Sequence, residues 1–289
     1  MLLVEAGGPA PSLSHIPGMV AFQQKTPLDW QFTTEVGPQV LSPKLRDPPK
    51  VSSLASLSTG GVSHWPRGKI LGGSSMLNYM LYVRGNSRDY DEWRDLGLKG
   101  WGWEDVLPYF KKSEDFIGEV EDREQNHGQG GDMKVTSEGY KEPVLEAFLK
   151  AGEELGYKVG DINGAVQDNG FGKSHTTTYR AERSGTYRAF AERYAGGNLT
   201  VLPYSQVTRV LVEKGRAMGV EVSRFGEHLR LLAEREVVLS AGAVGTPHIL
   251  LLSGIGDTQH LKEVSTGGPA TLQNVPGWSG ACATPTWGW

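Results

Sequence analysis

One stretch, residues 67–85, constrains the fold of this chain more than any other. It reads Arg-Gly-Lys-Ile-Leu-Gly-Gly-Ser-Ser-Met-Leu-Asn-Tyr-Met-Leu-Tyr-Val-Arg-Gly, in which Gly72 and Gly73 precede two serines. Glycine has no Cβ and lets backbone N–H groups approach an anion closely, and serine is favoured at a helix start. The mostly apolar residues from Met76 to Tyr82 predict a buried helix. The unpaired N–H groups and positive dipole end of such a helix favour a phosphate group.

Asn78 is expected one helical turn inside that helix, among apolar neighbours. A buried asparagine needs hydrogen-bond partners, which a cofactor can supply. The alternative interpretation is a glycine-rich loop that leads into an ordinary core helix. Short glycine motifs occur often by chance, so spacing alone leaves the two interpretations about equal.

The stretch as a whole resembles the first signature of the glucose–methanol–choline (GMC) oxidoreductases, a family of FAD-dependent alcohol oxidases and dehydrogenases. The resemblance runs from Trp65 to Trp93 and is closest to the insect glucose-dehydrogenase-like branch. Residues 242–256, which run from Gly-Ala-Val-Gly-Thr-Pro to Ser-Gly-Ile-Gly, resemble the second signature of the family. The two signatures stand in family order, about 170 residues apart.

The resemblance implies FAD as the cofactor and assigns roles to particular residues. It places the first-signature residues against the phosphate and the flavin, Glu5 on the adenosine ribose, and the backbone of Val207 on the adenine ring. The residues that it assigns to cofactor binding are Glu5, Arg67, Gly72, Gly73, Ser74, Asn78, Tyr79, Leu81 and Val207.

Glu5 follows Leu2-Leu3-Val4, which we expect to be a short buried strand. In dinucleotide-binding folds an acidic residue at the end of the second strand accepts hydrogen bonds from the ribose. The alternative is a solvated glutamate at a strand end. The Gly-x-Gly-x-x-Gly turn that normally lies some thirty residues upstream does not occur in residues 1–289. We therefore expect the first strand and the main phosphate loop to be missing.

The remaining segments give expectations for local structure. Residues 142–155 have helical periodicity, with Gly156 as a stop, and Val144, Leu145, Phe148, Leu149 and Leu155 are expected in the core. Runs at 199–202, 207–212 and 218–222 predict an antiparallel meander. Residues 236–243 predict a buried strand, and Thr246-Pro247 predicts the start of a helix over 248–253.

Two polar segments are expected to be loops, and one histidine is expected to have a structural role. Residues 42–63 and the charged, glycine-rich residues 111–132 predict exposed loops. His175 is expected to be structural rather than a catalytic base, because an isolated histidine is usually a satisfied structural residue.

The expected fold class is α/β: an incomplete Rossmann-like FAD-binding domain with a parallel sheet, a β-rich meander and part of a substrate or cap domain. Residues 1–257 would form the FAD-binding region with cap insertions, and residues 258–289 an atypical tail. The resemblance implies a C-terminal GMC domain that carries the catalytic histidine, and we expect this domain to be absent. No catalytic residue and no metal ligand is therefore predicted.

Composition limits the classes of partner. The net charge of −4 argues against a general nucleic-acid surface, and no apolar run reaches the roughly 18 residues that a membrane span needs. The single cysteine, Cys282, allows no internal disulfide. The resemblance implies a small alcohol or sugar as substrate, with the electron acceptor unknown.

Four hypotheses follow from these observations. The first is an FAD-dependent oxidoreductase that acts on CH–OH groups, truncated and weak or inactive as given. The second is a non-catalytic derivative of the same fold that binds a ligand or a partner. The third is a fragment that does not fold alone, because its sheet has an unpaired edge. The fourth is a nicotinamide-dependent dehydrogenase, in which the stretch at 67–85 has no place.

Overall fold

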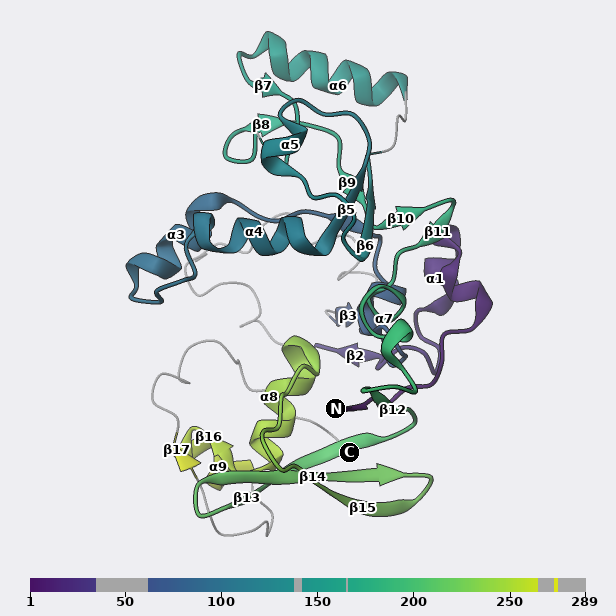
Figure 1. Ribbon diagram of the computed structural model, residues 1–289, viewed down its shortest axis with the longest axis vertical. Coiled ribbons are helices and arrows are strands. Elements are labelled where there is room, and N and C mark those ends of the chain that lie inside the picture. Colours follow the sequence, from purple (N-terminus) through teal and green to yellow (C-terminus); the bar gives the residue numbers. More distant parts are fainter. Residues whose placement is uncertain (35–61, 138–141, 165, 265–272, 275–289) are drawn as a thin grey trace. The chain divides into compact units, whose positions relative to one another are not determined.

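The computed structural model describes residues 1–34, 62–137, 142–164, 166–264 and 273–274. The loop expected at 42–63 lies almost entirely outside the described residues. Of the tail expected at 258–289, residues 258–264 and 273–274 are described, and Cys282 lies outside the described residues. The chain divides into two units (Figure 1). The first unit joins Met1–Pro9, Trp30–Lys69 and Thr200–Trp289, and the second joins Ala10–Asp29 and Ile70–Leu199.

In the first unit, β1 (Leu2–Val4) pairs in parallel with β12 (Thr200–Leu202), with Leu3 opposite Val201. This pair provides the expected parallel strands, and its two strands are nearly 200 residues apart in the sequence. The expectation that β1 is buried was wrong, because Leu2 is 45% exposed and Leu3 is 37% exposed. Within the described part of the chain β1 has a strand on one side alone, so its side chains stay partly open to solvent.

The predicted antiparallel meander is present, but its strands differ from those expected. It consists of β13 (Gln206–Glu213), β14 (Arg216–Arg224) and β15 (Glu227–Leu232). The run at 199–202 is not part of it, because these residues pair with β1 instead. Val222 on β14 is fully buried and Val210 on β13 is nearly so.

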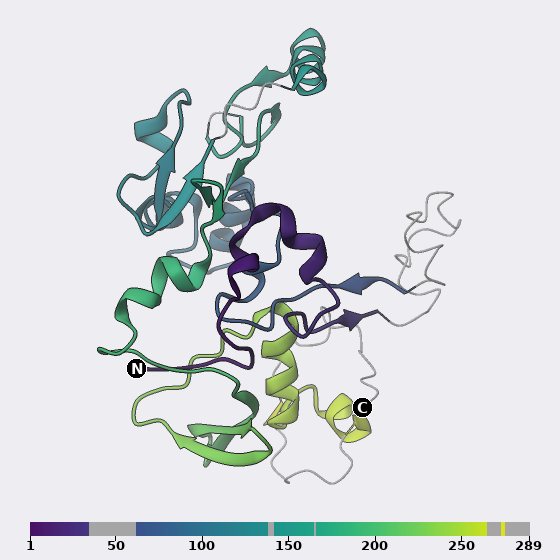
Figure 2. The same cartoon turned by 90° about the vertical axis from the view of Figure 1, so that its right-hand side faces the viewer.

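Helix α8 (Gly242–Leu252) lies beside the meander in both views (Figures 1 and 2). The Ser253 hydroxyl after the helix accepts a hydrogen bond from the Val210 backbone N–H at 2.8 Å, which ties the helix end to β13. The expected helix start at Thr246 was wrong, because Thr246 lies inside α8 and its Oγ1 accepts a hydrogen bond from Ala241 N at 2.9 Å.

Residues 236–241 form no strand, contrary to expectation. Val238 is 73% exposed, and no described strand pairs with this run. An apolar run becomes a strand when a neighbouring strand takes up its backbone hydrogen bonds. The short elements that complete the described part of the first unit are β2 (Phe32–Thr33), β3 (His64–Trp65), β16 (Ile255–Gly256), α9 (Thr258–Val264) and β17 (Gln273–Asn274).

The second unit is built on a four-stranded sheet in the order β4-β9-β6-β5. Its strands are β4 (Leu81–Tyr82), β5 (Glu114–Ile117), β6 (Met133–Thr136) and β9 (His175–Thr176). β5 and β6 run parallel, whereas β9 is antiparallel to both β4 and β6. Phe116, Met133 and Val135 form its hydrophobic core. The expectation of an exposed loop over 111–132 was wrong, because this segment contains β5 and several fully buried side chains.

Helix α6 (Pro143–Glu154) confirms the expected helix, and Gly156 follows it with a φ of +84°. The expected core stripe was largely wrong, because Leu149 alone of the five apolar residues is buried. Val144 is 81% exposed and Leu155 is 74% exposed. Periodicity shows that a helix has an apolar face, but it does not show that another element covers that face.

The other helices and strands of the second unit surround this sheet (Figure 1). The short helical turns are η1 (Ser12–His15), η2 (Pro17–Met19), η3 (Gly73–Met76) and η4 (Glu192–Tyr194). The helices are α1 (Val20–Gln23), α3 (Ser87–Asp95), α4 (Trp103–Ser113), α5 (Arg123–Asn126) and α7 (Thr186–Phe190). The remaining strands are β7 (Lys158–Val159), β8 (Gly170–Phe171), β10 (Thr178–Tyr179) and β11 (Glu182–Arg183).

Candidate functional site

The glycine–serine loop forms a tight turn in the second unit. Gly72 has a φ of +95° and Gly73 a φ of +54°, a left-handed conformation that favours glycine. Ile70, Met76 and Leu77 anchor the loop in a small hydrophobic core. The expected glycine turn beside two serines is therefore present, with both glycines half-buried.

The helix predicted after this turn is absent. Residues 73–76 form the single turn η3, and the chain then passes through Met80, with a φ of +63°, into β4. The backbone oxygen of Met80 accepts a hydrogen bond from Thr177 N at 2.8 Å, and Leu81 pairs with Thr176. These long-range hydrogen bonds override the local helical tendency, so no helix dipole points at a ligand here.

Asn78 is exposed rather than buried, which corrects the expectation drawn from its apolar neighbours. Tyr79 is 64% exposed and Leu81 is 61% exposed beside it. Ser74, on the turn, is exposed as well. The predicted cofactor residues of this unit thus form an open surface that combines polar groups with two large apolar side chains.

A second segment, residues 183–186, forms hydrogen bonds to the glycine–serine loop and packs against it. The Ser75 hydroxyl donates a hydrogen bond to Gly72 O at 2.6 Å and accepts one from Thr186 N at 3.0 Å. The Thr186 hydroxyl donates to Gly72 O at 3.0 Å. A Cβ on Gly185 would lie 2.5 Å from the Met76 sulfur, so the two segments are in close contact. Residues 183–186 are called the latch below.

The other three predicted cofactor residues lie in the first unit. The Glu5 carboxylate accepts a hydrogen bond from Gly7 N at 2.7 Å, which closes the turn after β1. Burial raises the pKa of Glu5, and hydrogen bonds from the Gly7 and Ala6 backbones oppose this effect. Arg67 donates to its neighbour Pro66 O at 2.7 Å, and Val207 lies in β13 opposite Val222. Glu5 is therefore part of its own turn and is not a freely solvated strand-end residue.

A buried ionic network that the sequence analysis missed lies next to the sheet of the second unit. Arg84 donates to Glu114 at 2.6 Å, and neither side chain has any exposed area. His127 lies between two carboxylates, with Nδ1 3.1 Å from Glu114 Oε1 and Nε2 2.7 Å from Asp161 Oδ2. Ionised carboxylates accept hydrogen bonds and do not donate them, so each ring nitrogen of His127 must carry a proton. His127 is therefore an imidazolium ion.

His175 joins this network as a neutral residue. Its Nδ1 lies 3.0 Å from Asn163 Nδ2, which is a donor, and its Nε2 lies 3.6 Å from Asp161 Oδ1. The buried, hydrogen-bonded position agrees with the structural role predicted for it. Potential metal-ligating atoms of His127, Asp161 and His175 lie within 4.8 Å of one another. Both nitrogens of His127 are already engaged by carboxylates, so we interpret the group as an ion network.

The pKa values follow from these contacts. Burial lowers the pKa of His127, but its hydrogen bonds to Asp161 and Glu114 outweigh this effect, so the pKa lies above its usual value. Burial raises the pKa of Asp161, but hydrogen bonds from His127 and from the Asn163 backbone outweigh this effect and lower it. Burial lowers the pKa of His175.

We expect the stability of the second unit to fall in mild alkali. A histidine whose pKa is raised on folding stabilises the fold fully below its unfolded pKa of about 6.5, and this contribution is lost as the pH rises through the folded value. The free energy of opening at the amides of residues 133–136, measured by hydrogen exchange and corrected for intrinsic rates, should therefore decrease as the pH rises above about 6.5 and through the raised folded pKa of His127.

The control for this experiment is His127→Gln, which removes the titrating group. The free energy of opening of this variant should be lower than that of the natural chain at every pH. It should also change little with pH over the same range. The depressed pKa of Asp161 gives a second loss, which appears as the pH falls through the folded value of that carboxyl group. A natural chain that shows no alkaline loss would contradict the imidazolium assignment.

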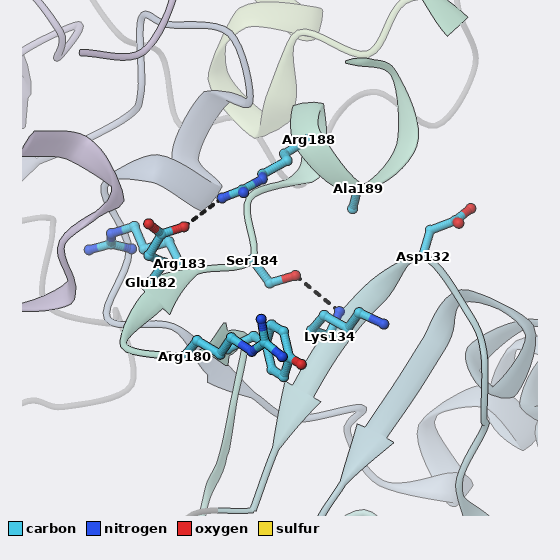
Figure 3. Close-up of a pocket in the computed structure, with 9 residues that line it drawn as sticks. Asp132, Lys134, Arg180, Glu182, Arg183, Ser184, Arg188 and Ala189 are labelled. Carbon is cyan, nitrogen blue, oxygen red and sulfur yellow. Dashed lines mark hydrogen bonds and ion pairs between the residues drawn. The ribbon is translucent and has the colours of Figure 1, made fainter. Parts of the chain in front are cut away.

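A cavity of about 480 Å³ opens beside β6, β11 and α7 (Figure 3). Its charged side chains are mostly paired: Arg188 with Glu182 at 2.6 Å, and Lys134 with Asp115. Arg180 lies over the Tyr179 ring, 5.0 Å from its centroid. None of the nine predicted cofactor residues, all of which are described, lines this cavity.

A family model described as GMC oxidoreductase matches residues 3–274, which is most of the chain. This chain belongs to the GMC oxidoreductase family. Its α/β fold with parallel strands agrees with that assignment.

Similar proteins support the family assignment. The glucose dehydrogenase (FAD, quinone) of Drosophila melanogaster is 41% identical over 96% of this GMC chain and 42% of its own length. The oxygen-dependent choline dehydrogenase of Rhizobium etli is 39% identical over 69% of this chain and 36% of its own length. The crystal structure of pyridoxine 4-oxidase from Mesorbium loti superposes with a TM-score of 0.75 at 27% identity, over 94% of this chain and 50% of that one. The GMC chain thus spans less than half the length of the two curated relatives and half the length of the pyridoxine 4-oxidase chain.

No helix in the described part of this GMC chain is both long enough and apolar enough to cross a bilayer.

Proposed function

We propose that this chain is the FAD-binding part of an oxidoreductase that acts on CH–OH groups of alcohols, sugars or polyols. Residues 1–257 would form the cofactor-binding region with its cap insertions. When bound, FAD supplies the acceptor for a hydride from the alcohol carbon. We assign no catalytic residue to this chain.

The observation that carries the proposal is the open surface of the glycine–serine loop. Asn78 Oδ1 accepts hydrogen bonds from Met80 N and Arg183 Nη1, and its Nδ2 group has no protein partner in the described part of the chain. The left-handed turn at Gly72 and Gly73 brings the backbone to the surface beside it. Exposed Tyr79 and Leu81 offer apolar area to a flat ring system. This combination fits a ligand that has both hydrogen-bond acceptors and an aromatic ring.

The first unit would hold the adenosine end of the cofactor. Glu5 lies directly after β1 and its carboxylate is fixed by the following turn, a position suited to ribose hydroxyl groups. Val207 in β13 would contact the adenine ring through its backbone. Arg67 and Ser74 are proposed as further contacts to the cofactor.

Titration of the purified chain with FAD tests the proposal. We expect a saturable change in flavin fluorescence at one FAD per chain. Asn78→Ala should weaken FAD affinity about 3- to 10-fold, since one hydrogen bond is lost. Gln125→Ala, which removes an exposed amide elsewhere in the same unit, should leave the affinity unchanged. A natural chain that gives no saturable signal would contradict FAD binding by this part of the protein.

A further inference from the structure

We infer that Arg183 is a positioning residue for the cofactor loop: it fixes the carboxamide of Asn78 so that Nδ2, and not the oxygen, is presented to a ligand. The inference rests on the proposed function, because it concerns the same loop. It specifies the ligand chemistry that Asn78 recognises, namely a hydrogen-bond acceptor such as a carbonyl or phosphate oxygen.

The orientation of the Asn78 amide follows from its two partners. The amide oxygen is 3.1 Å from Met80 N and 3.1 Å from Arg183 Nη1. A backbone N–H and a guanidinium are donors without acceptor capacity, so the atom between them must be the oxygen. A rotation of the amide by half a turn would place the NH₂ group against two donors.

Arg183 is itself held firmly. It is 1% exposed, it lies in β11 paired with β10, and the same Nη1 is 3.3 Å from Ser75 O. The guanidinium therefore contacts both the start and the end of the segment from Ser75 to Asn78. Its Nε and Nη2 atoms are buried without a partner among the described residues. Unsatisfied buried donors cost stability, which argues that this arginine is kept for more than packing.

The rest of the latch does not depend on Arg183. Thr186 bonds to Ser75 and Gly72, and Gly185 packs against Met76, on the other side of the loop. Removal of the Arg183 side chain should therefore leave the turn folded and remove one of the two hydrogen bonds that orient the Asn78 amide, which becomes more mobile. This separates an effect on amide orientation from an effect on the fold.

The experiment compares the natural full chain with Arg183→Met, Arg183→Lys and Asn78→Asp. In the absence of ligand, the Asn78 side-chain NH₂ group is observed by ¹⁵N NMR and assigned by its loss in Asn78→Asp. We expect an ordered amide in the natural chain, a mobile amide in Arg183→Met and partial recovery in Arg183→Lys. Arg188→Met, which removes an exposed arginine that pairs with Glu182, should leave the amide ordered.

A thermodynamic cycle with FAD as the probe supplies the second readout. Arg183→Met should weaken FAD affinity about 3- to 10-fold, as expected for one hydrogen bond. In an Asn78→Ala background the donor is already lost and no charge is added, so adding Arg183→Met should change the affinity by less than about twofold. If adding Arg183→Met in that background weakened FAD affinity by a further 3- to 10-fold or about that much, the inference would be overturned.

The two arms distinguish failure of the inference from failure of the proposed function. If the natural chain does not bind FAD, the proposed function fails for this chain, and the NMR arm still decides the role of Arg183. An Asn78 amide that is equally ordered in Arg183→Met and in the natural chain would overturn the inference whatever the result with FAD.

Discussion

Replacement of Arg84 with methionine is expected to lower the free energy of unfolding of the second unit by about 3–5 kcal/mol, the usual cost of removing one partner from a buried ion pair. Arg84 and Glu114 have no exposed side-chain area, and Arg84 also donates to Asn126 O at 2.6 Å. The variant would keep two buried carboxylates, Glu114 and Asp161, against the single positive charge of His127. Urea unfolding followed by circular dichroism measures the change.

The matched control is Arg188→Met. Arg188 and Glu182 are also 2.6 Å apart, but their side chains are 56% and 51% exposed. Exposed ion pairs contribute about 0–1 kcal/mol, so this variant should be nearly neutral. Equal losses in the two variants would show that distance, and not burial, sets the contribution, and would contradict our account of the network.

Replacement of Gly128 with alanine should destabilise the second unit by at least about 3 kcal/mol, the upper end of the range for overpacking. A Cβ at this position would lie 1.8 Å from the backbone oxygen of Lys111 and 2.8 Å from that of Glu114. Backbone atoms at the end of α4 and the start of β5 cannot move aside by a rotamer change. The Gly128 N–H also donates to Glu114 at 2.9 Å, so any shift disturbs the ion network.

Gly18→Ala is the control for that experiment. Nothing lies within 4 Å of a Cβ built on Gly18, and its φ lies outside the left-handed region. Thermal unfolding should therefore separate the two variants clearly, with Gly18→Ala close to the natural chain. If Gly128→Ala melts at the same temperature as Gly18→Ala, the close packing of Gly128 against Lys111 is not a constraint on the fold.

The sequence predicted those elements whose signal is local. The periodic run at 142–155 ends at Gly156, and α6 (Pro143–Glu154) lies within that run. The runs at 207–212 and 218–222 are short and rich in valine, and both β13 and β14 form. The sequence did not predict which face of α6 is covered, because burial depends on elements far away in the chain.

Long-range hydrogen bonds explain the errors around the site. Residues 76–82 are apolar enough for a helix, but Thr176 and Thr177 bind this segment as a strand. Residues 236–241 are apolar enough for a strand, but no described strand pairs with them. In both cases the presence or absence of a hydrogen-bonding neighbour among the described strands decides the local structure.

The ionic network escaped prediction because its members are scattered. Glu114 and His127 lie 13 residues apart in the segment 111–132, which the sequence predicts to be an exposed loop, and Asp161 lies in a separate segment. Two short motifs gave the nearest sequence signal. In one, a histidine directly precedes a glycine, at His127-Gly128. In the other, an aspartate begins a turn that ends in glycine, at Asp161-Ile162-Asn163-Gly164. Such motifs indicate close backbone approach, but they do not identify the charged partner.

The pairing of β1 with β12 has a consequence for the order of folding. Its two strands are nearly 200 residues apart, and closing a loop of that length costs about 5 kcal/mol of chain entropy. Most of the intervening chain belongs to the second unit, all of whose residues lie within Ala10–Leu199 and which can therefore fold without the β1–β12 pair. Once that unit has folded, the remaining loop is much shorter and its closure costs less. The second unit should therefore gain protection in pulsed hydrogen exchange before β1 does, and on the ribosome Leu2–Val4 must wait for Thr200–Leu202 to emerge.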